Sequence, residues 1–78
     1  MIALTIDKVD GFVAKLQRKG VDVRWDGWTM VFFKEDRNAL SSKNGRRRGN
    51  KWGFETRVSA DAAGRWLVNY RLARGANA

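Results

Sequence analysis

The first twenty residues place apolar side chains at helical spacing. One stripe runs along a single helix face and consists of Ile6, Val9, Phe12, Val13 and Leu16. Thr5 suits the N-cap, Leu4 and Val9 suit a hydrophobic staple around it, and Gly20 suits the position after the last turn. The pattern therefore predicts a helix over residues 6–19.

From Val21 the period changes from helical to alternating, which is typical of a half-buried strand. Asp26-Gly27 is a strong signal for a two-residue hairpin loop. That loop predicts a register of three pairs: Trp25 with Trp28, Val23 with Met30, and Val21 with Phe32. All six side chains then share one face, and Phe33 lies off that face, either exposed or covered by the loop that follows.

A third strand is predicted over residues 51–58, with Trp52, Phe54, Thr56 and Val58 on one face. Residues 60–74 fit two periods. Ala63, Trp66, Leu67 and Tyr70 follow helical spacing, whereas Trp66, Val68, Tyr70 and Leu72 alternate as in a strand. Capping residues at both ends favour the helix.

These elements predict an α+β fold of the order α-β-β-β-α, with two helices on one face of a three-stranded antiparallel sheet. The alternative is one helix against a four-stranded antiparallel sheet. We expect a single basic domain over residues 1–75, a flexible basic loop at about residues 38–50, and a frayed tail at residues 76–78.

The composition excludes several kinds of metal site and covalent cross-link. The 78 residues include no His, no Cys and no Pro, so disulfides and thiolate or imidazole metal sites are excluded. We expect no enzyme activity, no metal and no cofactor. No apolar run approaches the roughly 20 residues that span a bilayer, so the expectation is a cytoplasmic protein without a membrane partner.

The positive charge is concentrated in one segment. The net charge is +8, and the stretch from Arg37 to Lys51 carries six basic residues and no acidic one. Ten basic and eight acidic residues are spread over the rest of the chain. Because adjacent arginines repel each other, such a run usually serves a partner rather than the fold.

Phosphate groups are the expected ligands of this segment. The guanidinium fork matches phosphate oxygens bidentately, and closely spaced cations gain from counterion release. The sequence therefore predicts a nucleic-acid-binding module that contacts the phosphate backbone, with DNA and RNA both open. The candidate binding residues are Arg37, Lys43, Arg46, Arg47, Arg48, Lys51 and Trp52.

Trp52 is included because an aromatic ring beside a basic segment can stack on unpaired bases. A place in the core is the equally favoured interpretation of Trp52. Four other aromatic side chains are expected in the core, because a small domain needs large apolar groups: Trp25, Trp28, Phe32 and Phe54.

Two alternative functions remain. In the first, the basic loop docks on an acidic surface of a host protein, as in a small inhibitor of the kind that bacteriophages encode. In the second, Glu35, Asp36 and Glu55 hold Mg²⁺ near Lys51 in an enzyme. The same carboxylates also serve to balance neighbouring basic side chains, which is the simpler interpretation.

Overall fold

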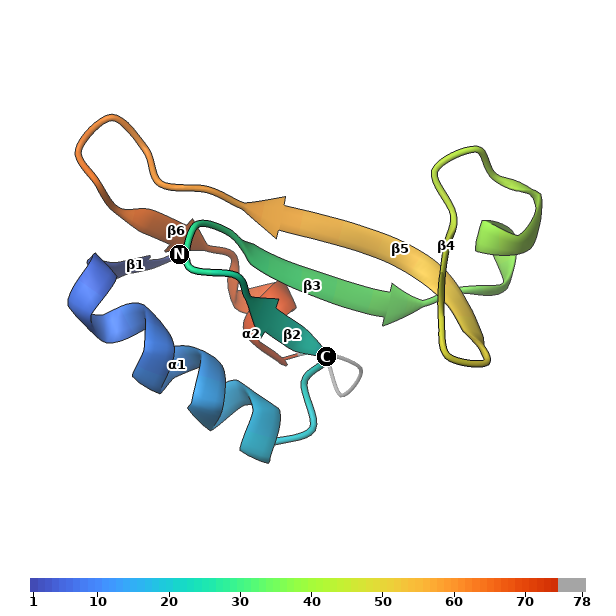
Figure 1. Cartoon of the computed structure of the whole chain (residues 1–78), viewed down its shortest axis with the longest axis horizontal. Coiled ribbons are helices and arrows are strands. Elements are labelled where there is room, and N and C mark those ends of the chain that lie inside the picture. Colours follow the sequence, from blue (N-terminus) through green and yellow to red (C-terminus); the bar gives the residue numbers. More distant parts are fainter. Residues whose placement is uncertain (75–78) are drawn as a thin grey trace.

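The computed structural model describes residues 1–74 and has the predicted α+β class (Figure 1). The expected frayed tail at residues 76–78 lies outside the described residues. The elements are β1 (Ile2–Leu4), α1 (Ile6–Arg18), β2 (Val23–Trp25), β3 (Met30–Glu35), the 3₁₀ helix η1 (Arg37–Ser41), β4 (Arg46–Arg48), β5 (Lys51–Val58), β6 (Trp66–Val68) and α2 (Tyr70–Arg74). They form a two-stranded sheet, β1-β6, and a four-stranded sheet in the order β2-β3-β5-β4, both antiparallel.

The predicted helix is confirmed as α1, which ends one residue earlier than expected. Thr5 occupies the N-cap position, although its hydroxyl bonds to the Asp7 carboxylate rather than to the helix backbone. Leu4 and Val9 are both buried, as the staple requires. Gly20 follows the helix with φ +91°, a conformation that favours glycine.

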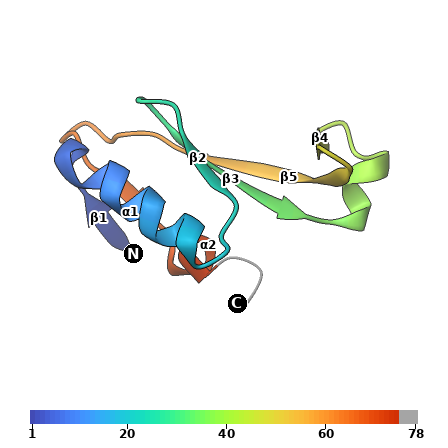
Figure 2. The same ribbon diagram turned by 60° about the horizontal axis from the view of Figure 1, so that its bottom comes forward.

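The core lies between α1 and one face of the four-stranded sheet, which we call the core face. Val23, Met30 and Phe32 project from this face, and α1 and α2 lie on the same side of the sheet (Figure 2). The β1-β6 pair closes the core, where the ring of Trp66 meets that of Trp25 edge to face at 5.5 Å. The ten buried residues of this cluster are Leu4, Val9, Val13, Leu16, Val21, Val23, Met30, Phe32, Trp66 and Val68.

The hairpin between β2 and β3 forms, but its predicted register is wrong by two residues. Val23 faces Phe32 and Trp25 faces Met30, so the loop consists of Gly27 and Trp28. A slip of two residues keeps every side chain on its predicted face, because the side-chain period of a strand is two. The difference matters most for Trp28, which is 80% exposed and does not belong to the core.

The side chain of Asp26 explains this register. Its Oδ1 accepts hydrogen bonds from the backbone N–H groups of Thr29 (2.7 Å) and Trp28 (2.8 Å). These donors lower the pKa of the Asp26 carboxyl below its usual value. Asp26 therefore stands at the base of the loop, opposite Thr29, rather than inside it.

The predicted helix over residues 60–74 is wrong. Residues 66–68 form β6, and only residues 70–74 are helical. The Asp61 carboxylate accepts from the N–H groups of Ala63 and Arg65, and Gly64 has φ +74°, so the chain turns here instead of starting a helix. The alternative four-stranded sheet is also only partly right, since β6 pairs with β1 and the fourth strand is β4.

The longest ladder joins β3 to β5 and runs from Met30↔Val58 to Glu35↔Gly53. On the face away from α1, which we call the open face, Val31 and Phe33 are nevertheless buried. Gly53 makes room for Phe33: a Cβ at this position would lie 2.8 Å from Cζ of Phe33 and would collide with the backbone carbonyl of Lys34. The burial of Phe33, left undecided by its sequence pattern, thus depends on Gly53.

We predict that Gly53→Ala destabilises the protein by about 2 kcal/mol, because the new methyl group must displace strand backbone and an aromatic ring. Gly11→Ala is the matched control, since no atom outside its own helix lies within 4 Å of a Cβ there. The control is expected to gain up to about 1 kcal/mol from helix propensity. Urea denaturation measures both changes. Equal stability of Gly53→Ala and the parent would contradict the packing described here.

Candidate nucleic-acid interface

All seven predicted binding residues lie in one projecting part of the fold. We call residues 34–53 the basic arm; it comprises the end of β3, η1, β4 and the start of β5. The arm lies at the end of the sheet far from β1 and the start of α1 (Figure 1). It carries seven basic and two acidic residues, so the concentration of charge along the chain is also a concentration in space.

Residues 38–50, expected as a flexible basic loop, contain most of η1 and all of β4. The Asp36 carboxylate accepts from the N–H of Asn38 (2.9 Å) and begins η1. Gly45 then passes so close to the carbonyl of Ala39 that a Cβ would not fit. Gly49, with φ +64°, and Asn50 form the turn between β4 and β5. The glycine and asparagine residues that suggested a loop therefore lie between η1 and β4 and in the turn from β4 to β5. The mobility of residues 38–50 stays a prediction.

The hairpin of β4 and β5 displays basic side chains on both faces. Arg46 pairs with Gly53, Arg47 with Trp52, and Arg48 with Lys51. Since successive residues of a strand point to opposite faces, Arg46, Arg48 and Lys51 share the open face. Arg47 and Trp52 project from the opposite face, directly across from each other.

The side chains of Arg46 and Arg47 are exposed, and each donates a hydrogen bond to a nearby backbone carbonyl. Nη1 of Arg46 donates to the carbonyl of Gly45 (3.0 Å), and Nε of Arg47 donates to that of Gly49 (2.8 Å). Within residues 1–74, neither of these arginines nor Lys51 forms an ion pair. Their charges therefore face solvent without a compensating carboxylate.

Arg48 differs from its two neighbours. Its guanidinium forms an ion pair with Asp22, and the two side chains are only 32% and 38% exposed. Asp22 immediately precedes β2, at the sheet edge opposite β4, so this contact spans the open face. Sequence reasoning missed the pair, because 26 positions separate the two residues and no local pattern connects them.

The other candidate residues lie around the hairpin. Arg37 begins η1 and Lys43 follows η1, and both are exposed. Trp52 is 38% exposed and is not part of the core cluster, so its place in the core is wrong, and its stacking on bases stays a prediction. Lys34 was missed as a candidate: it is exposed on the same face as Arg47, and the alternation of Met30, Phe32 and Lys34 along β3 was the available signal.

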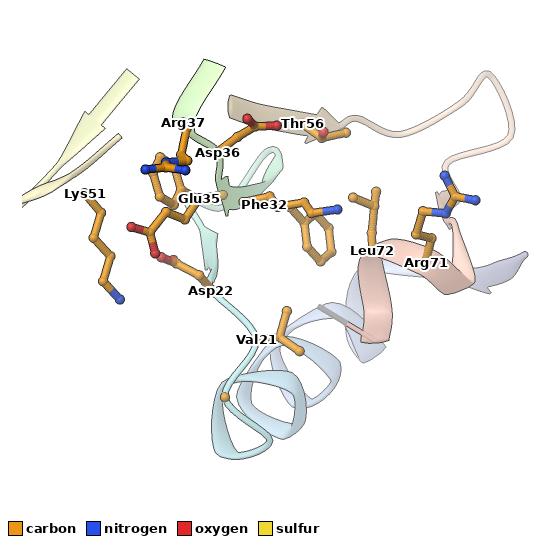
Figure 3. Close-up of a pocket in the computed structure, with 13 residues that line it drawn as sticks. Val21, Asp22, Phe32, Glu35, Asp36, Arg37, Lys51, Thr56, Arg71 and Leu72 are labelled. Carbon is orange, nitrogen blue, oxygen red and sulfur yellow. The ribbon is translucent and has the colours of Figure 1, made fainter. Parts of the chain in front are cut away.

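A cleft of about 740 Å³ separates the arm from α2 (Figure 3). Charged side chains of both signs occupy one end of this cleft, among them Asp22, Glu35 and Arg37. Leu72, beside Phe32, and Val21, below it in this view, line the other end. Because the charges are mixed, the cleft suits a phosphate group less well than the hairpin does.

The carboxylates considered for Mg²⁺ have other contacts in this fold. Glu55 lies within 4 Å of two guanidinium groups, those of Arg57 (3.6 Å) and Arg24 (3.9 Å). The Asp36 side chain caps η1, as described above. Over the part of the chain that the structure describes, no group of three or more potential metal-ligating side chains occurs.

No family model, curated protein or solved structure matches this chain. None of the helices in residues 1–74 has the length and apolar character needed to cross a membrane. The charge and exposure of the side chains in the arm are therefore the features that bear on function.

The ion pair between Arg48 and Asp22 is expected to stabilise the fold weakly. We predict a coupling free energy of about 0.2–1 kcal/mol in a double-mutant cycle of Asp22→Ala and Arg48→Ala, because both side chains are partly exposed. Arg47→Ala combined with Asp22→Ala is the control cycle and should be additive. Denaturation of the variants at low salt measures both couplings. Equal coupling in the two cycles would show that the pair has no specific effect.

Proposed function

We propose that this protein is a nucleic-acid-binding module whose basic arm contacts the phosphate backbone. The observation that supports this proposal is a group of exposed cations on one short hairpin that form no ion pair within residues 1–74: Arg46, Arg47 and Lys51. A folded hairpin holds these charges close together, so their mutual repulsion is relieved when a polyanion binds. Phosphate esters spaced along a nucleic-acid strand supply such an anion.

The geometry gives the three arginines of β4 unequal roles. Arg46 and Arg47 retain guanidinium donors directed to solvent, which suits bidentate phosphate contacts. Arg48 has its charge compensated by Asp22, so a phosphate must compete with a carboxylate for it. Arg48 accordingly contributes less to binding than its neighbours and more to holding the arm against the domain.

The binding is expected to depend on charge rather than on base sequence, because phosphate contacts carry no sequence information. If four to six phosphates are neutralised, the slope of log K against log[salt] should be roughly −4 to −5 on duplex DNA. Replacing Arg46, Arg47 and Lys51 by Ala should flatten that slope by nearly three units and weaken binding to all sequences alike. Fluorescence anisotropy over a salt series measures the slope.

The matched control removes the same charge from α1, with Lys8, Lys15 and Arg18 replaced by Ala. These side chains are exposed and lie outside the arm, so the control should lose little of the slope. Parent-like binding by the arm variant would contradict the site assignment. Absence of binding to duplex and single-stranded DNA and RNA at low salt would contradict the proposed function and favour an acidic protein surface as the partner.

A further inference from the structure

We infer that the β4–β5 hairpin of the arm enters the major groove of double-stranded DNA. This inference rests on the proposed function and adds the class of nucleic acid and the way in which it is engaged. It is supported by the distribution of cations over both faces of the hairpin and by the dimensions of the element that carries them.

A protein that binds nucleic acid on one flat surface needs its cations on one side of the sheet. Here the alternation of β4 and β5 places Arg46 and Lys51 on the open face and Arg47 on the opposite face. Lys34 of β3, which pairs with Phe54 of β5, joins Arg47 on that opposite face. All four side chains are exposed. This two-sided arrangement matches a groove, because phosphates then line both sides of an inserted ribbon.

The end of the hairpin is also narrow enough to enter a groove. Its two strands are joined by the two-residue turn Gly49–Asn50, and β4 is the edge strand of its sheet. β5 also pairs with β3 as far as Gly53, and the N–H of Asp36 donates to the carbonyl of Trp52, so the part that is only two strands wide is the tip around the turn. The major groove of B-form DNA is about 12 Å wide and accepts a two-stranded ribbon. The major groove of A-form RNA is deep and narrow, which disfavours the same insertion in duplex RNA.

The exposure of Trp52 is consistent with a duplex. Trp52 is 38% exposed, lies across from Arg47 and belongs to the ladder of β5, so its surroundings cover more than half of the residue. In a groove the exposed part of the indole can contact apolar groups such as the thymine methyl. Recognition of a single strand by stacking would need a more exposed ring face.

Two double variants test whether both faces take part. Lys34→Ala with Arg47→Ala removes two charges from one face, and Arg46→Ala with Lys51→Ala removes two from the other. Each pair should flatten the salt slope on duplex DNA by about two units, if each side chain neutralises one phosphate. The control is Lys8→Ala with Lys15→Ala on α1, which should leave the slope unchanged. Thermal melting confirms that every variant is folded.

The probes are a duplex DNA of mixed sequence, the duplex RNA of the same sequence and either DNA strand alone. We expect the parent to bind duplex DNA most tightly. Equal or tighter binding to duplex RNA or to the single strand, or a change of slope confined to one face, would overturn groove insertion while leaving nucleic-acid binding intact. Absence of binding to all three probes would instead overturn the proposed function on which the inference rests.

Discussion

The ladder between β3 and β5 is the constraint on which the rest of the structure depends. At one end it presents Met30 and Phe32 to α1, and at the other it supports the basic arm. A slip of one residue would turn those core side chains to the open face. Gly53 fixes the distal end, because only a residue without Cβ lets Phe33 and the backbone of Lys34 approach so closely. The register of this one ladder therefore fixes both the side chains that enter the core and the position of the arm.

This arrangement separates the core that stabilises the fold from the arm that we propose binds nucleic acid. The apolar side chains of α1, β1 and β6 gather at one end of the sheet, where they exclude water. The arm adds little to that core, so it can carry mutually repelling charges at a small cost in stability. The pair of Arg48 with Asp22 connects the two parts, since it joins the edge strand of the arm to the segment before β2. One arginine of the run thus serves the fold, while its neighbours remain available to a ligand.

Local patterns predicted much of this fold, and contacts between distant residues account for the rest. The stripe and caps of α1 were sufficient for its prediction, as was the alternation of β5. The register at Trp28 was missed because the Asp26 carboxylate, not turn propensity, decides it. The helix expected over residues 60–74 failed because pairing of β6 with β1 outweighs a weak helical period. For the candidate site, the run of arginines was evident, but only the fold shows which of them is tied to Asp22.

The most direct test of this account is amide chemical-shift mapping of the ¹⁵N-labelled protein during titration with duplex DNA. The account predicts that the largest shifts occur in residues 43–52, with smaller changes at Lys34 and Arg37 and almost none along α1. Raising the salt concentration should reverse these shifts, since the contacts are electrostatic. Shifts centred on α1 or on the exposed Trp28 loop, or no shifts at low salt, would contradict the claim that the arm is the binding site.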